Sequence, residues 1–523
     1  VQRGVDALSP GDTLSIAPGE YLESVSRAKL GASNATTIIR AEIPGTVILR
    51  GDVPAPPFRK VEGYRFVYSA DLKSDSEAQA VNDLDKLAIF KRAPNLVELE
   101  FTPGCFYHDR AQNRLYVSTA DMEPVGARFY TVSLSTNAGI ELNKPIGVRL
   151  EGIAATGFRK RGILMEEPDN CVISNCLAYF NAQGGICISE RYWRGVTGGN
   201  TIENCTAWAN SGVGLMVNEP RRDTMRNSTS FLNESLGMEM YNGNSSRMEN
   251  NLSWGNQQDF LLKQGPRDSV HEIERCTMPG LWGHETHSNI VMHSIAGRIN
   301  GNAGRSFFTN SIILNDIKSL NQDIEFADPL NHDYRLQASS RFRGAAGGGK
   351  DLGPFQYEKN IFFLSAAGDD KADGLSVSNA WNTFARAASN LRAGDTLYIL
   401  AGRYEEELEL KAGKMKASTI FIRGRGTGTV ELAGNVQIDN CHNLSFERVH
   451  FTGNVAVSGG SELAFEQCSF ACPGGFSTRD ADGLRLIHNE FAGSGKAQVN
   501  LAGSKNAFLA GNLFENSGVE AIS

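Results

Sequence analysis

The chain has 523 residues, 55 of them glycine, with a formal net charge of −8 and a pI of about 5.7. The acidic balance argues against a nucleic-acid partner held by bulk electrostatics. No run approaches the roughly eighteen apolar residues of a membrane span. A chain of this length is too long for one compact core, whereas a solenoid grows along its axis without that limit.

The chain opens in the same way twice. The segment around Asp12 recurs around Asp395, 383 positions later (395 − 12), and the same offset relates Tyr21 to Tyr404. The offset holds without a gap for roughly forty residues, which indicates a repeated architecture. We therefore expect a first module at 1–357 and a second of the same kind at 358–523. The second stops in mid-coil, so we expect it to be truncated at its C-terminal end.

The region 171–265 repeats a shorter pattern, in which an asparagine precedes alternating apolar residues, a second asparagine and a second alternating run. The leading asparagines stand 29, 23 and 23 positions apart, at Asn175, Asn204, Asn227 and Asn250. Alternation is the period of a half-buried strand. Short strands that recur every two dozen residues or so bury a continuous apolar face only when coils stack. The sequence therefore predicts an all-β solenoid of parallel strands, with only a short helix around 381–389.

Three motifs resemble one family. The Pro-Gly-Asp-Thr and Pro-Gly-Glu-Tyr sequences within 10–21 resemble the opening coil of right-handed parallel β-helix proteins of the pectate-lyase-like superfamily, such as chondroitinase B and its related alginate lyases. The segment 102–117 resembles an insertion of several β-helix glycoside hydrolases, and 328–336 resembles the usual end of such domains. The resemblance implies two tandem right-handed parallel β-helices, a polysaccharide or oligosaccharide substrate, and a secreted or periplasmic location.

The alternation also predicts which side chains face inward, namely Ile186, Leu215, Met238 and Phe260 in one internal stack. Glu239, Tyr241 and Lys263 then lie outside on two neighbouring strands, and Glu219 follows the strand before them. Because coils are about 4.8 Å apart, these four side chains share one sugar-sized patch. We expect them to be the catalytic candidates. Glu239 leads, since its neighbours in the same outward row are apolar; the alternative is a merely solvated face.

Five further residues are candidates for substrate binding. Asn218 lies in the outward row of Tyr241, and Glu190 lies at the end of an adjacent strand. Asp223 and Arg222 follow Glu219 in a loop, and Trp193 lies in the long loop of the 29-residue coil, where it could stack on a sugar. No metal ligands are expected.

Three functions from different classes fit this strip. The first is a glycoside hydrolase with Glu239 and Glu219 as its carboxylate pair, which needs no cofactor. The second is a polysaccharide lyase, in which Lys263 abstracts the proton α to a uronate carboxylate. The resemblance to chondroitinase B then implies Ca²⁺ on Glu219, Glu239 and Asn218, although Tyr241 stands where a second strand carboxylate is expected. The third is a non-catalytic glycan-binding solenoid. The acidic strip favours the hydrolase.

Overall fold

A computed structural model describes the chain apart from a set of short segments. The segments outside the described residues are 120, 122–124, 126–127, 190–197, 219–221, 244–246, 265–271, 275, 285–289, 293–294, 302–306, 310–311, 314–324, 332, 346–348, 354, 412–417, 427, 493–497, 511 and 516–520. Only the backbone is described at 242–243, 259–264, 272–274, 277–284, 290–292, 295–301, 307–309, 312–313, 330 and 510. Among the described residues, no helix is long and apolar enough to cross a membrane.

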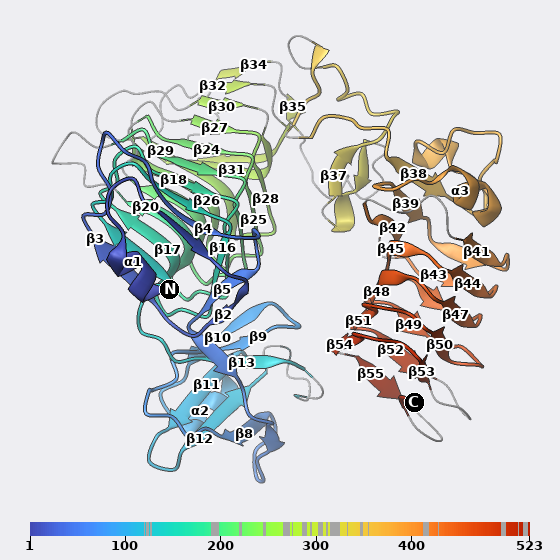
Figure 1. Cartoon of the computed structure of the whole chain (residues 1–523), viewed down its shortest axis with the longest axis horizontal. Coiled ribbons are helices and arrows are strands. Elements are labelled where there is room, and N and C mark those ends of the chain that lie inside the picture. The colour runs from blue at the N-terminus through green and yellow to red at the C-terminus, as the bar shows by residue number, and fades with distance from the viewer. Residues whose placement is uncertain are drawn as a thin grey trace. The chain divides into compact units, whose positions relative to one another are not determined.

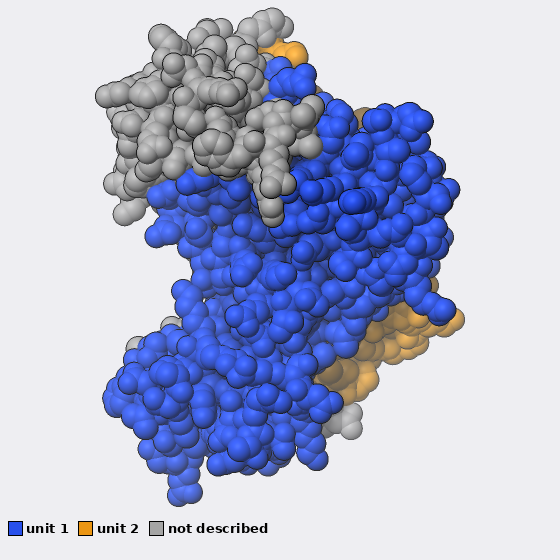
Figure 2. Space-filling model, turned by 90° about the vertical axis from the view of Figure 1, so that its left-hand side faces the viewer, with its two compact units in different colours: residues 1–317, 345–348, 352–354 blue, residues 318–344, 349–351, 355–523 orange. Residues whose placement is uncertain are grey.

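The chain forms two compact units, drawn in two colours in Figure 2. Unit 1 comprises residues 1–317, 345–348 and 352–354, and unit 2 comprises 318–344, 349–351 and 355–523. The limit expected from the sequence, between 357 and 358, stays a prediction.

Unit 1 is built of stacked parallel strands (Figure 1). One ten-stranded sheet contains β1 (Thr13–Ile16), β4 (Thr37–Ala41), β15 (Val148–Glu151), β18 (Val172–Ser174), β21 (Thr201–Glu203), β24 (Thr224–Arg226), β27 (Arg247–Glu249), β30 (Glu272–Glu274), β32 (Ile290–Met292) and β34 (Phe307–Thr309). A second, seventeen-stranded sheet covers two faces of the coils. Its first face holds β3 (Val25–Ala28), β14 (Ile140–Asn143), β17 (Arg161–Glu166), β20 (Gly184–Ser189), β23 (Val213–Asn218), β26 (Leu236–Gly243), β29 (Gln258–Gln264), β31 (Thr277–His284) and β33 (Ile295–Gly301). Its second face holds β2 (Gly19–Tyr21), β5 (Val47–Arg50), β16 (Ile153–Thr156), β19 (Leu177–Tyr179), β22 (Thr206–Trp208), β25 (Thr229–Phe231), β28 (Leu252–Trp254) and β35 (Ile312–Ile313).

An inserted sheet separates the early coils of unit 1 from the later ones in sequence. It contains β6 (Asp52–Pro54), β7 (Arg59–Lys60), β8 (Val67–Asp71), β9 (Ala80–Asp83), β10 (Ala88–Arg92), β11 (Cys105–Asp109), β12 (Arg114–Ser118) and β13 (Tyr130–Ser133), with α2 (Leu96–Phe101). Ala80 and Ile89 of this sheet form a buried cluster with Phe180 and Ala209 of the coils; Leu84, Leu87, Tyr179 and Trp208 pack against that cluster. The rings of residues 179, 208, 231 and 254 stack at centroid distances of 4.3, 5.8 and 4.5 Å, which extends this contact along the solenoid.

Unit 2 contains three further parallel sheets (Figure 1). They are β38 (Ile361–Leu364), β39 (Thr396–Ile399), β42 (Ile420–Gly424), β45 (His442–Glu447), β48 (Ser461–Glu466), β51 (Arg485–Ile487) and β54 (Phe508–Ala510); β40 (Gly402–Tyr404), β43 (Val430–Leu432), β46 (His450–Phe451), β49 (Ser469–Phe470), β52 (Glu490–Ala492) and β55 (Leu513–Glu515); and β41 (Leu408–Lys411), β44 (Val436–Asp439), β47 (Val455–Ser458), β50 (Phe476–Arg479) and β53 (Val499–Ala502). A hairpin of β36 (Phe326–Asp328) and β37 (Asp333–Leu336), joined by the 3-10 turn η3 (Pro329–Asn331), and a second 3-10 turn, η5 (Val377–Asn379), complete the unit.

The predicted all-β class and parallel stacking are confirmed, and so is the inward row. Ile186, Leu215 and Met238 are fully buried in one core cluster and pair in register. The backbone of Phe260 pairs with Met238, although its side chain lies outside the described residues. The predicted helix is present as α3 (Phe384–Asn390). As expected, there is little other helix in the described residues: α1 (Gln2–Ala7), which is the same element about 383 positions earlier, and α2 have six residues each.

The repeated asparagines have two separate tasks. The leading ones, Asn175, Asn204, Asn227 and Asn250, adopt φ between 50 and 54°, the left-handed conformation that asparagine tolerates in turns. The second asparagine of each coil belongs to a buried ladder. In this ladder the side-chain oxygen of one asparagine accepts the backbone N–H of the equivalent asparagine in the preceding coil. Asn181 donates to Asn210 at 3.0 Å, Asn210 to Asn233 at 3.1 Å and Asn233 to Asn256 at 2.9 Å. Buried backbone donors at the coil corners are thereby satisfied.

The residues repeated at an offset of 383 make the same hydrogen bonds in both units. The Asp12 carboxylate accepts the N–H of Ser9 at 2.8 Å, and Asp395 accepts that of Arg392 at 2.7 Å. The Tyr21 hydroxyl donates to the carbonyl of Ala17 at 2.8 Å, and the Tyr404 hydroxyl donates to the carbonyl of Leu400 at 2.7 Å. The repeated sequence therefore forms the same local hydrogen bonds at the start of each stack of coils.

Candidate active strip

Five parallel strands of unit 1, β17, β20, β23, β26 and β29, carry the candidate strip. Their register places one outward row at Leu164, Cys187, Met216, Glu239 and Leu261, and the adjacent row at Glu166, Ser189, Asn218, Tyr241 and Lys263. Both rows agree with the order expected from the alternating pattern. Glu239 and Tyr241 therefore belong to one face of the solenoid, two positions apart on β26.

Glu239 is largely shielded from water. Its side chain is 5% exposed, while Met238 and Met240 on either side of it are buried in the core. Because neighbours along a strand point to opposite faces, Glu239 points away from the core and is covered on the outer side. Its paired neighbour Met216 is half-buried. In this respect Glu239 differs from Glu166 of the adjacent row, which is half-buried.

Cys187 lies in the same row, two strands from Glu239. Burial raises the pKa of its thiol to about 11; the positive charge of Arg161 opposes this shift, and the charges of Glu239 and Glu166 add to it. The thiol therefore stays protonated at neutral pH and acts as a small apolar neighbour rather than as a nucleophile. All nine cysteines are free and buried.

Polar groups fill the row beside Glu239. The Asn218 amide donates to the Ser189 hydroxyl at 3.5 Å, and the Asn143 amide donates to the Glu166 carboxylate at 2.9 Å. Tyr241, like Asn218, is half-buried. This row can offer hydrogen bonds to hydroxyl groups of a ligand lying along the strip.

Arg161, which was not among the residues predicted for the strip, begins β17 at the start of the same face. Its Nη1 is buried and has no hydrogen-bond partner among the described residues. Its charge acts on Cys187, as described above. Arg161 stands directly before Gly162, the glycine that opens the alternating run of this coil. Nothing in the local sequence pattern marks it as part of the strip.

Several predicted residues have no described side chain. Glu219, Glu190 and Trp193 lie outside the described residues, and of Lys263 only the backbone is described. That backbone pairs with Tyr241, so Lys263 occupies the strand and row expected of it. The roles of these four residues stay predictions.

Asp223 and Arg222 have different surroundings. Asp223 is 1% exposed, and its carboxylate accepts the backbone N–H of Asn200 at 2.6 Å. Asn200 in turn accepts the N–H of Cys171 at 2.9 Å, so Asp223 continues an internal ladder of the coil turns. This geometry favours a structural role for Asp223 over substrate binding. Arg222 is exposed, with a φ of 58°, and its role stays a prediction.

The calcium site of the lyase hypothesis stays a prediction, because Glu219, one of its three proposed ligands, lies outside the described residues. Among the described residues, no group of three His, Cys, Asp or Glu side chains is placed to hold a metal. Of the three ligands that the lyase hypothesis needs, Glu239 pairs with Met216 and Leu261, which carry no oxygen donor. Calcium takes six to eight oxygen ligands. We therefore derive no step through a metal.

The comparisons with known proteins concern the fold. A family model described as a right handed beta helix region matches residues 131–267. Over these residues the chain is similar to right-handed parallel β-helix proteins, in agreement with the stacked parallel strands of unit 1. No curated protein matches.

Solved structures with similarity to the chain include a complex of XylC with xylose (10% identity, 60% of this chain and 72% of that chain, TM-score 0.42). Others are the pectate lyase Pel9A (13% identity, 68% and 90%, TM-score 0.34) and the PL6 family alginate lyase AlyGC (10% identity, 98% and 98%, TM-score 0.27). The reaction has to be argued from the side chains of the strip.

Proposed function

We propose that the protein is a carbohydrate-active enzyme that cleaves glycosidic bonds of a polysaccharide on the outer face of unit 1, as a glycoside hydrolase. The observation that carries this proposal is the position of Glu239. It is a carboxyl group facing outward, 5% exposed, in a row whose described members are otherwise apolar.

Hydrolysis of a glycosidic bond needs two carboxyl groups with different tasks. One donates a proton to the leaving oxygen, and the other attacks the sugar or activates water from the opposite side. Glu239, sheltered from water, is suited to hold the proton for the leaving group. Glu219, expected at the end of the neighbouring strand, is the second carboxylate. Asn218 and Tyr241 then orient the sugar through its hydroxyl groups.

The second candidate is a polysaccharide lyase, and the place of Lys263 beside Tyr241 in the strand register favours it. Lys263 would take the proton α to a uronate carboxylate, and the sugar–oxygen bond would then break by β-elimination. This reaction leaves a double bond in the product, whereas hydrolysis does not.

The test is a screen of the intact protein against neutral and uronate-containing polysaccharides. New reducing ends without ultraviolet absorbance indicate a hydrolase, and reducing ends with absorbance of an unsaturated product indicate a lyase. Glycan binding without cleavage would contradict the enzymatic proposal and favour a binding solenoid. A secreted or periplasmic location, where such substrates occur, belongs to the same proposal.

A further inference from the structure

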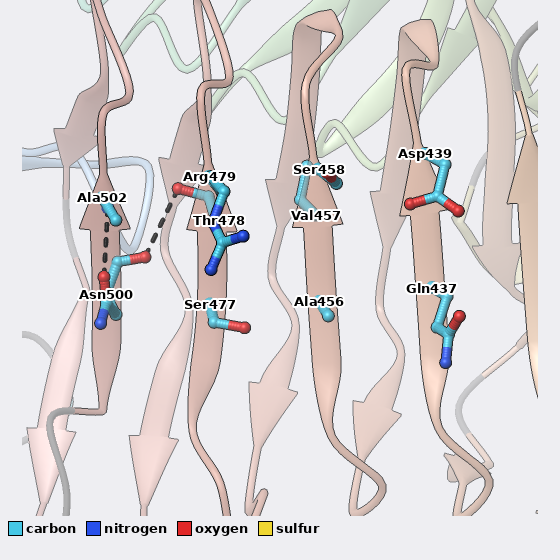
Figure 3. A pocket seen from close by; sticks show the side chains of 10 residues that line it. All are labelled: Gln437, Asp439, Ala456, Val457, Ser458, Ser477, Thr478, Arg479, Asn500 and Ala502. Carbon is cyan, nitrogen blue, oxygen red and sulfur yellow. Dashed lines mark hydrogen bonds between the residues drawn. The ribbon is translucent and has the colours of Figure 1, made fainter.

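Unit 2 has a hollow of its own on the outer face of four neighbouring strands, β44, β47, β50 and β53. Its volume is about 270 Å³. Figure 3 shows the lining side chains on the parallel strands, with the long ones on both sides of a row of small ones. The lining residues are Gln437, Asp439, Ala456, Val457, Ser458, Ser477, Thr478, Arg479, Asn500 and Ala502.

The hollow follows from the strand register. Ala456 and Ser458 of β47 lie between Gln437 and Asp439 on one side and Ser477 and Arg479 on the other. Their intervening neighbour Val457 is buried in the core. Small side chains on the central strand therefore form a floor, and longer polar ones form its walls.

Within the described part of the chain, the two charged residues of the walls make no ion pair, although the charge of Asp439 acts on Lys411 beside it in the register. Among the described residues, neither the Asp439 carboxylate nor the Arg479 guanidinium makes an ion pair or a side-chain hydrogen bond. Lys411, the nearest cation in the row of Asp439, pairs instead with Glu409 at 2.8 Å. The backbones of Asp439 and Arg479 are two strands apart, about 10 Å, and their side chains make no ion pair across the floor. Both groups are thus left available to a ligand.

The lining favours one class of ligand. It carries one carboxylate and one guanidinium, so its formal charge is zero and it does not attract a polyanion. Asp439, Gln437 and Asn500 present planar polar groups, which suit adjacent hydroxyl groups. No exposed apolar side chain larger than alanine lies in the hollow to seat a peptide or lipid.

We propose that this hollow binds an extended segment of an uncharged, hydroxyl-rich polysaccharide, apart from the strip of unit 1. The distance between strands is close to the length of one sugar unit in an extended chain. A glycan with one sugar over each strand from β44 to β53, whose outermost strands are about 14 Å apart, therefore places roughly four units in the hollow. Arg479 and Asp439 bind hydroxyl groups at separate sugars of the segment. The site holds polymer without cleaving it, so it goes beyond the proposed reaction.

The experiment is affinity electrophoresis of the full chain in gels containing arabinoxylan, galactomannan or mixed-linkage β-glucan, with pectate and alginate as acidic counterparts. The full chain carries Glu239→Gln throughout, so that the polymer is not consumed. Arg479→Ala is expected to weaken retardation by one of the neutral polymers about tenfold, as for loss of one charge-assisted hydrogen bond. Ser458→Trp, which fills the hollow, should weaken it at least as much. Arg485→Ala on β51 removes an equally exposed arginine from another sheet and should change nothing.

Fragments of the retained polymer with two, four and six sugar units test the length. Affinity should rise up to four units and then stay level. Unchanged retardation of both hollow variants, loss of binding in the Arg485→Ala control, or retardation by the acidic polymers alone would overturn the proposal. Turnover of a short soluble substrate by Ser458→Trp, made without Glu239→Gln, should equal that of the unaltered chain. Failure of the reaction in unit 1 would therefore be seen separately.

Discussion

Glu239 of β26 stands opposite Met216 of β23, in a row that Cys187 continues on β20. In the register of a parallel sheet, these side chains share one face at intervals of about 4.8 Å. A thioether therefore borders the carboxyl along the solenoid, with a thiol one strand beyond it, whereas Asn218 and Tyr241 lie in the neighbouring row. This division into an apolar and a polar row is the basis of the proposed reaction.

Substitutions of two methionines test which side chains of β26 and its neighbour β23 point into the core. Met240→Asp places an unpaired charge in the core of unit 1, because Met240 is fully buried there. It should lower the free energy of unfolding by about 4 kcal/mol. Met216→Gln, at a half-buried outward position, should cost less than about 1 kcal/mol. Denaturant unfolding measures both, and equal losses would contradict the assigned facing.

The buried asparagine ladder is tested at Asn210. Its oxygen accepts the N–H of Asn181, and its amide donates to the carbonyls of Ala178 and Trp208 at 3.0 and 3.1 Å. Asn210→Ala leaves several of these groups without partners and should cost about 3 kcal/mol. Exposed Asn137 is the matched control, and Asn137→Ala should lower the free energy of unfolding by less than about 0.5 kcal/mol. Similar midpoints for the two variants in a thermal melt would exclude a structural ladder.

Much of this architecture is predictable from the sequence, because a period of two fixes which side chains face inward and the recurring asparagines mark each corner. The rows of Met216 and Asn218 follow from that alone. The burial of Asp223 could not be predicted in this way. An acidic residue in a loop after a strand is normally solvated, and only the hydrogen bonds between neighbouring coils place Asp223 inside. The burial of the Arg161 guanidinium could not be predicted for a related reason, because it depends on neighbouring coils.

Asp333 and Arg335 of β37 make unit 2 sensitive to acid. Burial raises the pKa of the Asp333 carboxyl, but the hydrogen bonds and charge of Arg335 and the Tyr398 hydroxyl outweigh it and hold that pKa below its ordinary value of 3.8. A carboxyl with a lowered pKa stabilises the fold above that ordinary value, and the contribution is lost as pH falls through the folded-state pKa.

Asp333→Asn should therefore cost about 3 kcal/mol at neutral pH, because Arg335 loses its charged partner. The loss of stability below about pH 4 should be shallower in this variant than in the unaltered chain. Thermal unfolding between pH 7 and pH 2 measures both effects, with Glu490→Gln at an exposed position as the control. If Asp333→Asn unfolds in acid with the same pH dependence as the unaltered chain, the pair does not govern this response.

The most direct test of the account is the rate of Glu239→Gln on a polysaccharide that the unaltered protein cleaves. The substitution keeps the shape of the side chain and removes its ionisation, so unfolding should change by less than about 1 kcal/mol. We expect kcat to fall by at least about a hundredfold, as for loss of a general acid. Tyr241→Phe, two positions along β26, should change kcat much less. A Glu239→Gln variant that cleaves at the rate of the unaltered protein would contradict the placing of the reaction on this strip.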